Sequence, residues 1–245
     1  MAEQPELRAA AYAFSEVTDS EAPFMARDLA GDLATSRRIA RRWPDFLLAL
    51  LLPDGTVAAR AVSIPFCAAV DGRAALPFTG WDGVVHWAIE DALDERPPTS
   101  ACALEIAVAA PYRGRGLSSD AITQLRDTAS RHGLKELVAP LRPPEKTAEP
   151  FTPMEAYAAR KRTDGLPEDR WLRAHVRAGA EIVGIAPASM TVVASLTEWR
   201  EWTDLPFVED GLVVVPGGLA PVMASQDLQL GVYVEPNVWV RHRLE

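Results

Sequence analysis

Apolar residues follow two spacings along this chain, one typical of helices and one typical of strands. Residues 24–42 show a loosely helical spacing, and Pro44 is expected to stop that helix. Two apolar runs flank the sequence Pro-Asp-Gly at 53–55. This pattern predicts an antiparallel hairpin, because Asp-Gly favours the tight turn that joins two strands. A further helix is expected over residues 83–93.

The middle of the chain predicts a strand, a helix and a second strand in that order. Residues 101–110 are apolar except for Glu105, which is typical of a central strand buried on both faces. Apolar residues at every fourth position from Leu117 to Ala129 define one face of a helix, and residues 134–141 predict the second strand. The two strands should run parallel, with the start of the helix directed at the turn before it.

The rest of the chain predicts two short helices and then mostly strands. Helices are expected over 154–162 and 168–178, and a third, rich in tryptophan, over 197–202. Five apolar runs predict strands at 180–185, 189–196, 211–215, 219–224 and 228–234. The predicted fold class is therefore α+β with a mixed sheet.

Composition excludes several classes of protein. The chain has 245 residues and a net charge of −9, so no global positive field draws it to nucleic acid or to an anionic membrane. No apolar run approaches the roughly 20 residues that cross a bilayer, and residues 1–17 lack the pattern of a secretory signal. We therefore expect a cytoplasmic protein. Cys67 and Cys102 lack metal-site or disulfide spacing and are expected to be core thiols.

The turn at residues 112–119 carries the clearest chemical signal. Gly114 and Gly116 allow the backbone to curl with its N–H groups pointing inward, and the dipole of the following helix adds partial positive charge. Such a turn can hold a diphosphate, although glycines also serve turns that bind nothing. No Gly-Lys-Ser/Thr follows, and the third glycine of GxGxxG is missing. Neither a P-loop nor a Rossmann site is therefore predicted.

These residues resemble the GNAT superfamily of acyl-CoA-dependent N-acyltransferases. The pyrophosphate loop of that family has the pattern Arg/Gln-x-x-Gly-x-Gly/Ala, which Arg113 to Ser118 match except for serine at the last position. His175 and Gly179 match the family's Tyr-x-x-x-Gly-Phe, with histidine in place of the tyrosine often assigned as general acid. The resemblance covers roughly residues 46–185.

The resemblance implies a GNAT-like mixed, largely antiparallel sheet flanked by helices, with a V-shaped cleft between the strands at 101–110 and 136–141. It implies one GNAT-like domain over 1–245, with an N-terminal and acceptor-side part to residue 100, a coenzyme-binding core over 101–185, and C-terminal strands over 186–245. Coenzyme A would lie in the cleft. The residues implied to hold it are Ile106, Val108, Arg113, Gly114, Arg115, Gly116, Leu117, Ser118 and Ser119.

The activity implied is direct transfer of an acetyl or other small acyl group from acyl-CoA to the amine of a small molecule, with no metal. Two alternatives stay open. One is a transferase whose acyl or aminoacyl group is carried on tRNA or a carrier protein, docked on the arginine stripe within residues 37–42. The other is a non-catalytic protein that binds coenzyme A. A homodimer also stays open, because the late strands can pair with a second subunit.

Five side chains are candidates for chemistry in the cleft. Glu105, if buried, would have a raised pKa that suits a base, whereas a structural pair with an arginine is the alternative. His175 is the favoured catalytic residue, since histidine titrates near neutral pH and the resemblance places it near the thioester sulphur, whereas a histidine that is simply packed or solvated is the alternative. Trp81 and Trp87 are candidates for the acceptor pocket, with core packing as the alternative. Arg142 is a candidate ligand for an acidic group, unless it forms only a surface ion pair.

Overall fold

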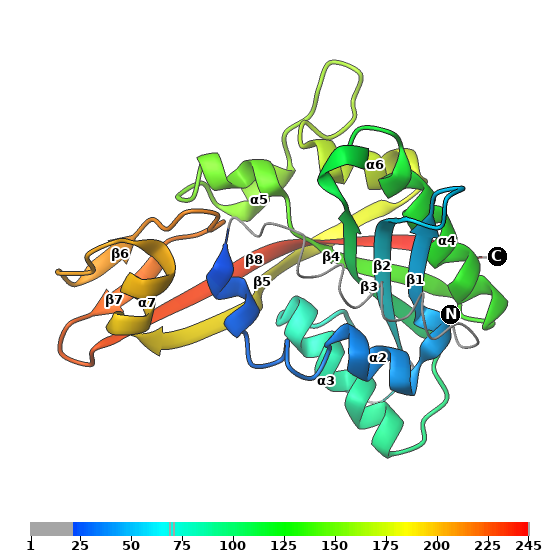
Figure 1. The fold of residues 1–245 in the computed structure, drawn as a ribbon, viewed down its shortest axis with the longest axis horizontal. Helices are drawn as coiled ribbons and strands as arrows, with labels where there is room; N and C mark the ends of the chain where they lie inside the picture. The colour runs from blue at the N-terminus through cyan, green and yellow to red at the C-terminus, as the bar shows by residue number, and fades with distance from the viewer. Residues whose placement is uncertain (1–21, 69, 71, 245) are drawn as a thin grey trace.

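The fold is built on an eight-stranded sheet, seen in a computed structural model that describes residues 22–68, 70 and 72–244. The strand order is β1-β2-β3-β4-β8-β7-β6, and β5 pairs with β8 outside this path. The strands are β1 (Leu47–Leu51), β2 (Val57–Phe66), β3 (Ser100–Val108), β4 (Glu136–Leu141), β5 (Glu181–Ser195), β6 (Gly211–Val213), β7 (Val222–Ser225) and β8 (Leu230–Arg243). Figure 1 shows the long strands β5 and β8 side by side across the molecule.

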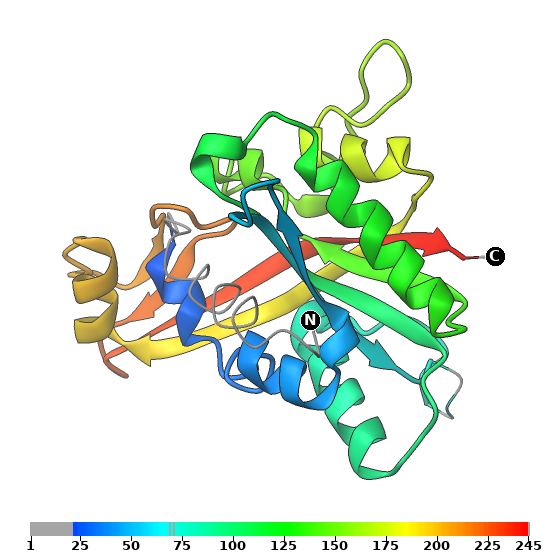
Figure 2. The ribbon, with the colours of Figure 1, turned by 45° about the vertical axis from the view of Figure 1, so that its right-hand side comes forward.

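Helices lie on both sides of this sheet (Figure 2). The α-helices are α2 (Ser36–Arg42), α3 (Gly80–Leu93), α4 (Leu117–Arg131), α5 (Met154–Ala158), α6 (Arg170–Arg177) and α7 (Leu196–Thr203). Short 3-10 helices are η2 (Pro23–Arg27), η3 (Pro44–Phe46), η4 (Ala110–Tyr112) and η5 (Pro144–Ala148). The predicted α+β class, with a largely antiparallel sheet flanked by helices, is confirmed.

The central strands β3 and β4 are the parallel pair within the described sheet, and they pair over a very short length. Their partners are Ala101 with Leu137 and Cys102 with Val138, and no pairing follows toward their C-terminal ends. Each strand nevertheless keeps its other neighbour, since β3 pairs with β2 as far as Val108 and β4 pairs with β8 throughout. The sheet therefore opens between β3 and β4.

Alternate residues of the central strands pack against different helical layers, as the two-residue period of a strand requires. Ala101 of β3 belongs to a core cluster with Leu125 of α4 and Leu172 of α6. Its neighbour Cys102 belongs to another cluster, with Val84 of α3. Both cysteines are free and buried, which confirms that they are core thiols.

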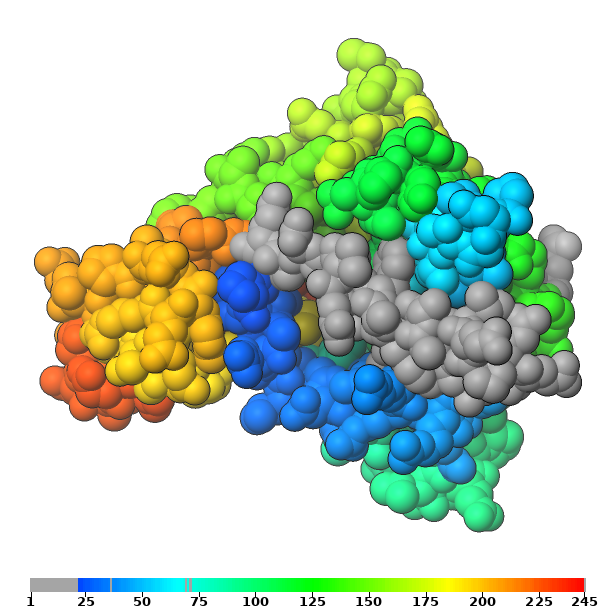
Figure 3. All heavy atoms as spheres, viewed as in Figure 1, coloured from blue at the N-terminus to red at the C-terminus, as the bar shows by residue number. Residues whose placement is uncertain are grey.

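A separate core cluster lies under the C-terminal strands. The Phe24 ring of η2 packs 5.2 Å from the Trp199 ring and 5.0 Å from the Tyr233 ring, measured between centroids. Trp199 belongs to α7 and Tyr233 to β8, and all three side chains are fully buried. Figure 3 shows the blue η2 segment lying directly against the yellow and orange end of the molecule. Residues far apart in the sequence thus close this end of the sheet.

The prediction of a single helix over residues 24–42 is wrong. The chain forms η2, then turns, then the separate helix α2. The turn is fixed by the Asp28 carboxylate, whose Oδ2 accepts a hydrogen bond from the Gly31 N–H at 3.1 Å. Thr35 then caps α2 by accepting from the Arg38 N–H at 3.4 Å. Side chains that bond to nearby backbone groups interrupt a helix in this way.

The strands after residue 180 are longer than predicted. The runs at 180–185 and 189–196 form one strand, β5, whose pairing with β8 is interrupted between Ala186 and Met190. Strand β8 continues through Pro236 to Arg243, although its second half was not predicted as a strand. Pro236 lies opposite the interruption of β5, and proline is tolerated where a ladder is broken.

The residues of β5 that do not pair with β8 hold the start of α3 in place. The Trp81 N–H donates to the Ser189 hydroxyl at 2.9 Å, and the Ala188 N–H donates to the Phe78 carbonyl at 3.2 Å. Gly80 makes this approach possible. Its φ is 48°, and a Cβ there would lie 2.2 Å from the Ser189 hydroxyl oxygen. The position of Trp81 therefore depends on a glycine immediately before it.

We expect Gly80→Ala to lower the free energy of unfolding by about 2–4 kcal/mol, because it adds a steric clash to backbone strain. Gly133→Ala is the matched control, since Gly133 also has a positive φ, 70°, but a Cβ there meets nothing within 4 Å. The control should cost only about 1–2 kcal/mol. Urea unfolding followed by circular dichroism measures both, and equal losses would contradict the close contact with Ser189.

Candidate functional site

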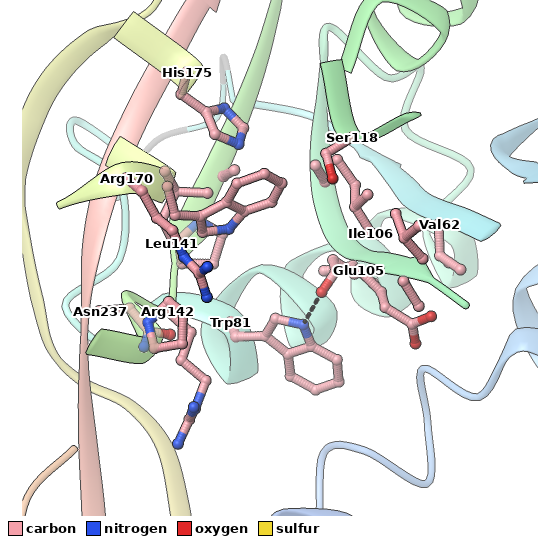
Figure 4. Close-up of a pocket in the computed structure, with 18 of the residues that line it drawn as sticks. Val62, Trp81, Glu105, Ile106, Ser118, Leu141, Arg142, Arg170, His175 and Asn237 are labelled. Carbon is pink, nitrogen blue, oxygen red and sulfur yellow. Dashed lines mark hydrogen bonds between the residues drawn. The ribbon is translucent and has the colours of Figure 1, made fainter. Parts of the chain in front are cut away.

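A cavity of about 780 Å³ lies where β3 and β4 separate. This volume falls within the range of roughly 300–1,000 Å³ common for small-molecule and cofactor pockets. Figure 4 shows Ser118, Ile106 and Glu105 on one side of the space, and His175 and Arg142 on the other. The cavity thus joins residues of β3, of the glycine turn, of α6 and of the end of β4.

The glycine turn presents unused backbone donors beside this cavity. Gly114 and Gly116 have φ of 76° and 85°, and a Cβ at either meets nothing within 4 Å, so the backbone conformation is what requires glycine. The Ser119 N–H already bonds to the Gly116 carbonyl at 2.8 Å. In the described part of the chain, the N–H groups of residues 114–118 donate to no acceptor. Free amides at the start of a 15-residue helix form a site for an anion.

The predicted coenzyme residues divide into those that line the cavity and those that do not. Ile106, Val108, Arg113, Gly114 and Ser118 line it, whereas Arg115, Gly116, Leu117 and Ser119 do not. The Arg115 guanidinium lies over the Tyr112 ring, 5.4 Å from its centroid. Four of the nine predicted positions therefore lie outside the cavity wall.

The free edge of β3 carries two occupied carbonyl groups. The Val108 carbonyl accepts a hydrogen bond from Arg113 Nε at 3.2 Å. The Leu104 carbonyl accepts from Trp81 Nε1 at 3.2 Å, at a position where the pairing of β3 with β2 skips one residue. Such a bulge bends the strand locally. Trp81 thereby becomes part of the wall below the free edge (Figure 4).

Glu105 lines the cavity but is held by Arg60. The Glu105 carboxylate accepts from Arg60 Nε at 2.8 Å and from Nη2 at 2.7 Å, and Arg60 is only 3% exposed. The Glu105 side chain is 40% exposed, so the burial on which its role as a base was conditional is absent. Figure 4 shows its carboxylate pointing away from His175. The structural alternative, a pair with an arginine, is present.

His175 lies on α6 with its imidazole buried in the cavity wall. It is 1% exposed, and its Nδ1 lies 3.1 Å from Nε2 of His242. Burial, and then the neighbouring His242, lowers the pKa of His175 to about 3. The expectation that His175 titrates near neutral pH is therefore wrong. Its Nε2 has no hydrogen-bond partner among the described residues.

The three candidate substrate residues have different surroundings. Trp81 and Arg142 line the cavity, whereas Trp87 does not. The Trp87 ring packs beside Phe66 and under the Arg73 guanidinium, 4.7 Å from the ring centroid. Arg142 Nε lies 2.9 Å from a carboxylate oxygen of Glu235, which is completely buried, so this ion pair is not the surface pair considered as the alternative.

Sequence reasoning missed several residues of the cavity wall, among them Asn237, Met190 and Arg170. Asn237 is 2% exposed, and its amide donates to Glu235 at 3.1 Å. The available signal was the alternation of polar residues at 235 and 237 within an apolar run. Pro236 between them concealed that alternation, because proline argues against a strand.

Two carboxyl groups interact one residue beyond Trp81. Burial, and then the charge of Asp28, raises the pKa of Asp82 to about 8. Burial also raises the pKa of Asp28, which is 3% exposed. Oδ1 of Asp82 is buried and has no hydrogen-bond partner among the described residues. Two carboxyl groups in such contact cannot both ionise without a large cost, so the pair holds a proton near neutral pH.

We expect Asp82→Asn to stabilise the fold at pH 8 by about 1–3 kcal/mol and to have little effect near pH 4. The pKa of Asp82 rises from 3.8 to about 8 on folding, so its favourable contribution is complete below pH 4 and is lost as pH rises to 8. The asparagine variant has no proton to lose. Urea unfolding at both pH values measures the difference, with Asp120→Asn on the exposed first turn of α4 as control. A benefit independent of pH would contradict the shared proton.

No described helix combines the length and apolar character needed to cross a membrane. Within residues 22–68, 70 and 72–244, no group of three or more His, Cys, Asp or Glu side chains is placed to hold a metal ion.

The chain is similar to a fungal enzyme. It is 36% identical over 187 residues to the arginine N-acetyltransferase avaD of Aspergillus versicolor, and the match covers 68% of this chain. The chain spans 64% of the length of that relative. No family model matches the chain.

Two solved structures have a similar fold. The loading GNATL domain of CurA from Lyngbya majuscula aligns with a TM-score of 0.62 at 15% identity, over 98% of this chain and 96% of that one. The GphF GNAT-like decarboxylase in complex with isobutyryl-CoA aligns with a TM-score of 0.52 at 18% identity, over 95% and 96% of the two chains. At these identities the likeness shows the fold alone.

Proposed function

We propose that this chain is an N-acyltransferase. Its expected resemblance to the GNAT superfamily is confirmed, and it has the GNAT fold. It would move an acetyl or other small acyl group from acyl-CoA to the amine of a small molecule. The observation that carries the proposal is the cavity between β3 and β4, bordered by the free edge of β3 and by the free amides of the glycine turn. An extended molecule with a diphosphate at one end fits both features.

Two proteins similar to this chain support the proposal. The relative at 36% identity acetylates an amine, since it is an arginine N-acetyltransferase. One of the two structures of the same fold holds isobutyryl-CoA. The first observation supports a small amine as the acceptor, and the second supports acyl-CoA as a ligand of this fold.

The residues of the turn are suited to hold the coenzyme. The N–H groups of 114–118 would bind the diphosphate, and the Arg113 guanidinium would add charge beside it. The backbone of Ile106 and Val108 would pair with the pantetheine as an added strand. The contact of Arg113 with the Val108 carbonyl is compatible with this pairing, because a carbonyl oxygen has a second lone pair.

Coenzyme A supplies the acyl group as a thioester, and the chain would align it with the amine. The amine lone pair forms the new C–N bond, the C–S bond breaks, the amine loses a proton and the thiolate gains one. Alignment alone removes much of the barrier, because it replaces a bimolecular encounter by a reaction within one complex. The amine must arrive deprotonated, since its lone pair is the nucleophile.

The acceptor would enter the cavity beside Trp81, Arg142 and Asn237. The net charge of −9 favours a small cationic amine over an anionic one. Carriage of the acyl group on tRNA or a carrier protein, a homodimer, the cytoplasmic location and the single-domain organisation remain predictions.

We expect the purified protein to release free coenzyme A from acetyl-CoA in the presence of an accepted amine. The acceptors to be tried are arginine, lysine, spermidine and a neutral primary amine, with thiol release and product mass as readouts. Binding of coenzyme A and of acetyl-CoA is measured in parallel by calorimetry. If the protein binds neither coenzyme A nor acetyl-CoA, the proposal is wrong and an acyl group carried on a macromolecule is favoured. If it binds them but acylates none of the amines, a non-catalytic role is favoured.

We expect Arg113→Ala to weaken binding of coenzyme A by about 10- to 100-fold, because it removes one charge-assisted hydrogen bond to phosphate. The control is Arg162→Ala, which removes an exposed guanidinium paired with Asp164 away from the cavity. Calorimetry at two salt concentrations measures both. Equal affinities for the two variants would remove Arg113 from the phosphate site.

A further inference from the structure

Two guanidinium groups line the side of the cavity that lies opposite the glycine turn. Arg142 directly follows β4, and Arg170 is the first residue of α6. Figure 4 shows both on the same side of the space as Asn237, across from Ser118 of the turn. Among the described residues of the cavity wall, the third arginine is Arg113, which belongs to the turn itself. Positive charge is therefore present where the turn does not need it to bind a diphosphate.

The Arg142 guanidinium is held in one orientation by the protein. Its Nε donates to both carboxylate oxygens of Glu235, at 2.9 and 3.1 Å, and its Nη2 donates to the Gly217 carbonyl. Glu235 is completely buried and also accepts from the Tyr233 hydroxyl and the Asn237 amide, so the anchor is itself fixed. A side chain that is already ordered loses little conformational freedom when it binds a ligand.

The opposite side of the Arg142 guanidinium is open. Nε and Nη2 face Glu235 and Gly217, so Nη1 lies on the other side of the planar group. In the part of the chain that the structure describes, Nη1 has no hydrogen-bond partner, and it is not among the buried polar atoms that lack one. The Arg142 side chain is 31% exposed, and it lines the cavity. Nη1 therefore offers two N–H donors to a ligand.

The second guanidinium, that of Arg170, is only loosely held. Its Nε lies 3.2 Å from a carboxylate oxygen of Glu145, and both side chains of this pair are largely exposed. Exposed ion pairs of this kind contribute little free energy, so Arg170 is available to a stronger partner. Among the described cavity residues, the one carboxylate is that of Glu105, which is paired with Arg60. The positive charge of Arg170 thus meets no free carboxylate of the cavity wall.

We infer that Arg142 and Arg170 form a subsite for a carboxylate, so that the acceptor is an amine that also carries a carboxylate. This inference rests on the proposed function, because it names the class of acceptor for that reaction. A carboxylate bound to the N–H groups of a guanidinium forms charge-assisted hydrogen bonds, which are stronger than neutral ones. Lysine and arginine carry a carboxylate and still have a net positive charge, which agrees with the net charge of −9 of the chain.

Pairs of amines that differ by one carboxylate test the subsite on wild-type protein. Cadaverine is lysine without its carboxylate, and agmatine is arginine without it. We expect kcat/KM to be about 10- to 100-fold higher for the amino acid of each pair, because it gains a charge-assisted hydrogen bond. Calorimetry on protein saturated with coenzyme A measures the same preference without turnover. If neither kcat/KM nor affinity favours the amino acid in either pair, the inference is wrong.

The variant Arg142→Lys separates ligand binding from the support of Glu235. Its ammonium group can still pair with Glu235, but the free Nη1 is lost. We expect the preference for lysine over cadaverine to fall to within a few fold through a higher KM for lysine, with the KM for acetyl-CoA nearly constant. Arg160→Lys is the matched control and should keep the preference, because Arg160 pairs with Glu149 at 2.7 Å outside the cavity.

The remaining outcomes decide between the subsite and the proposed function. A larger rise in KM for acetyl-CoA than for lysine in Arg142→Lys would place the guanidinium on the coenzyme and overturn the inference. Should this variant fail to fold, the wild-type pairs still decide, together with a lower preference for lysine in Arg170→Gln. Wild-type protein that binds lysine more tightly than cadaverine but acylates neither would contradict the proposed function and leave the subsite standing.

Discussion

The site depends on one constraint, which is that β3 and β4 pair over only two residues. Beyond Cys102 and Val138 each strand keeps only its outer neighbour, so the two halves of the sheet diverge. Unpaired backbone groups are costly where water is excluded, and a free strand edge readily takes up another extended chain. An extended ligand can restore the missing hydrogen bonds. The opening that interrupts the fold is therefore also the feature that can bind a pantetheine arm.

A second requirement is that β8 stays in place where it passes from β4 to β7. Glu235, which is fully buried, lies in this stretch. A buried carboxylate without partners would be strongly destabilising. Here it accepts hydrogen bonds from Arg142, from the Tyr233 hydroxyl at 2.7 Å and from Asn237. Arg142 also donates to the Gly217 carbonyl, so one guanidinium joins the cavity wall to the C-terminal strands. Arg142 therefore has a structural role that does not depend on whether it also contacts a substrate.

Local patterns predicted the parts of this structure that local forces determine. The hairpin, the strand–helix–strand unit and the glycine turn follow from spacing and turn chemistry, and the structure has all three. The continuous β8 was missed because Pro236 argues against a strand, yet the interruption of β5 opposite it makes proline acceptable. The protonation of His175 was missed because burial beside His242 is a tertiary contact between residues 67 positions apart. The pairing of Glu105 with Arg60 was open in the sequence, because the register of β2 against β3 decides it.

The groups that line the cavity bear on how transfer would proceed. The Glu105 carboxylate is paired with Arg60, and the His175 imidazole is buried and uncharged near neutral pH, so neither of the two residues favoured from the sequence is placed as a free general acid or base. Direct acyl transfer does not require one, because a neutral amine already carries the nucleophilic lone pair and a thiolate is a good leaving group. What the protein must supply is alignment, which well-oriented reactions show to be worth up to about 7–11 kcal/mol. A rigid turn for the diphosphate and a strand edge for the pantetheine would provide alignment at two points. In the proposed reaction, rate enhancement then arises chiefly from geometry rather than from proton transfer.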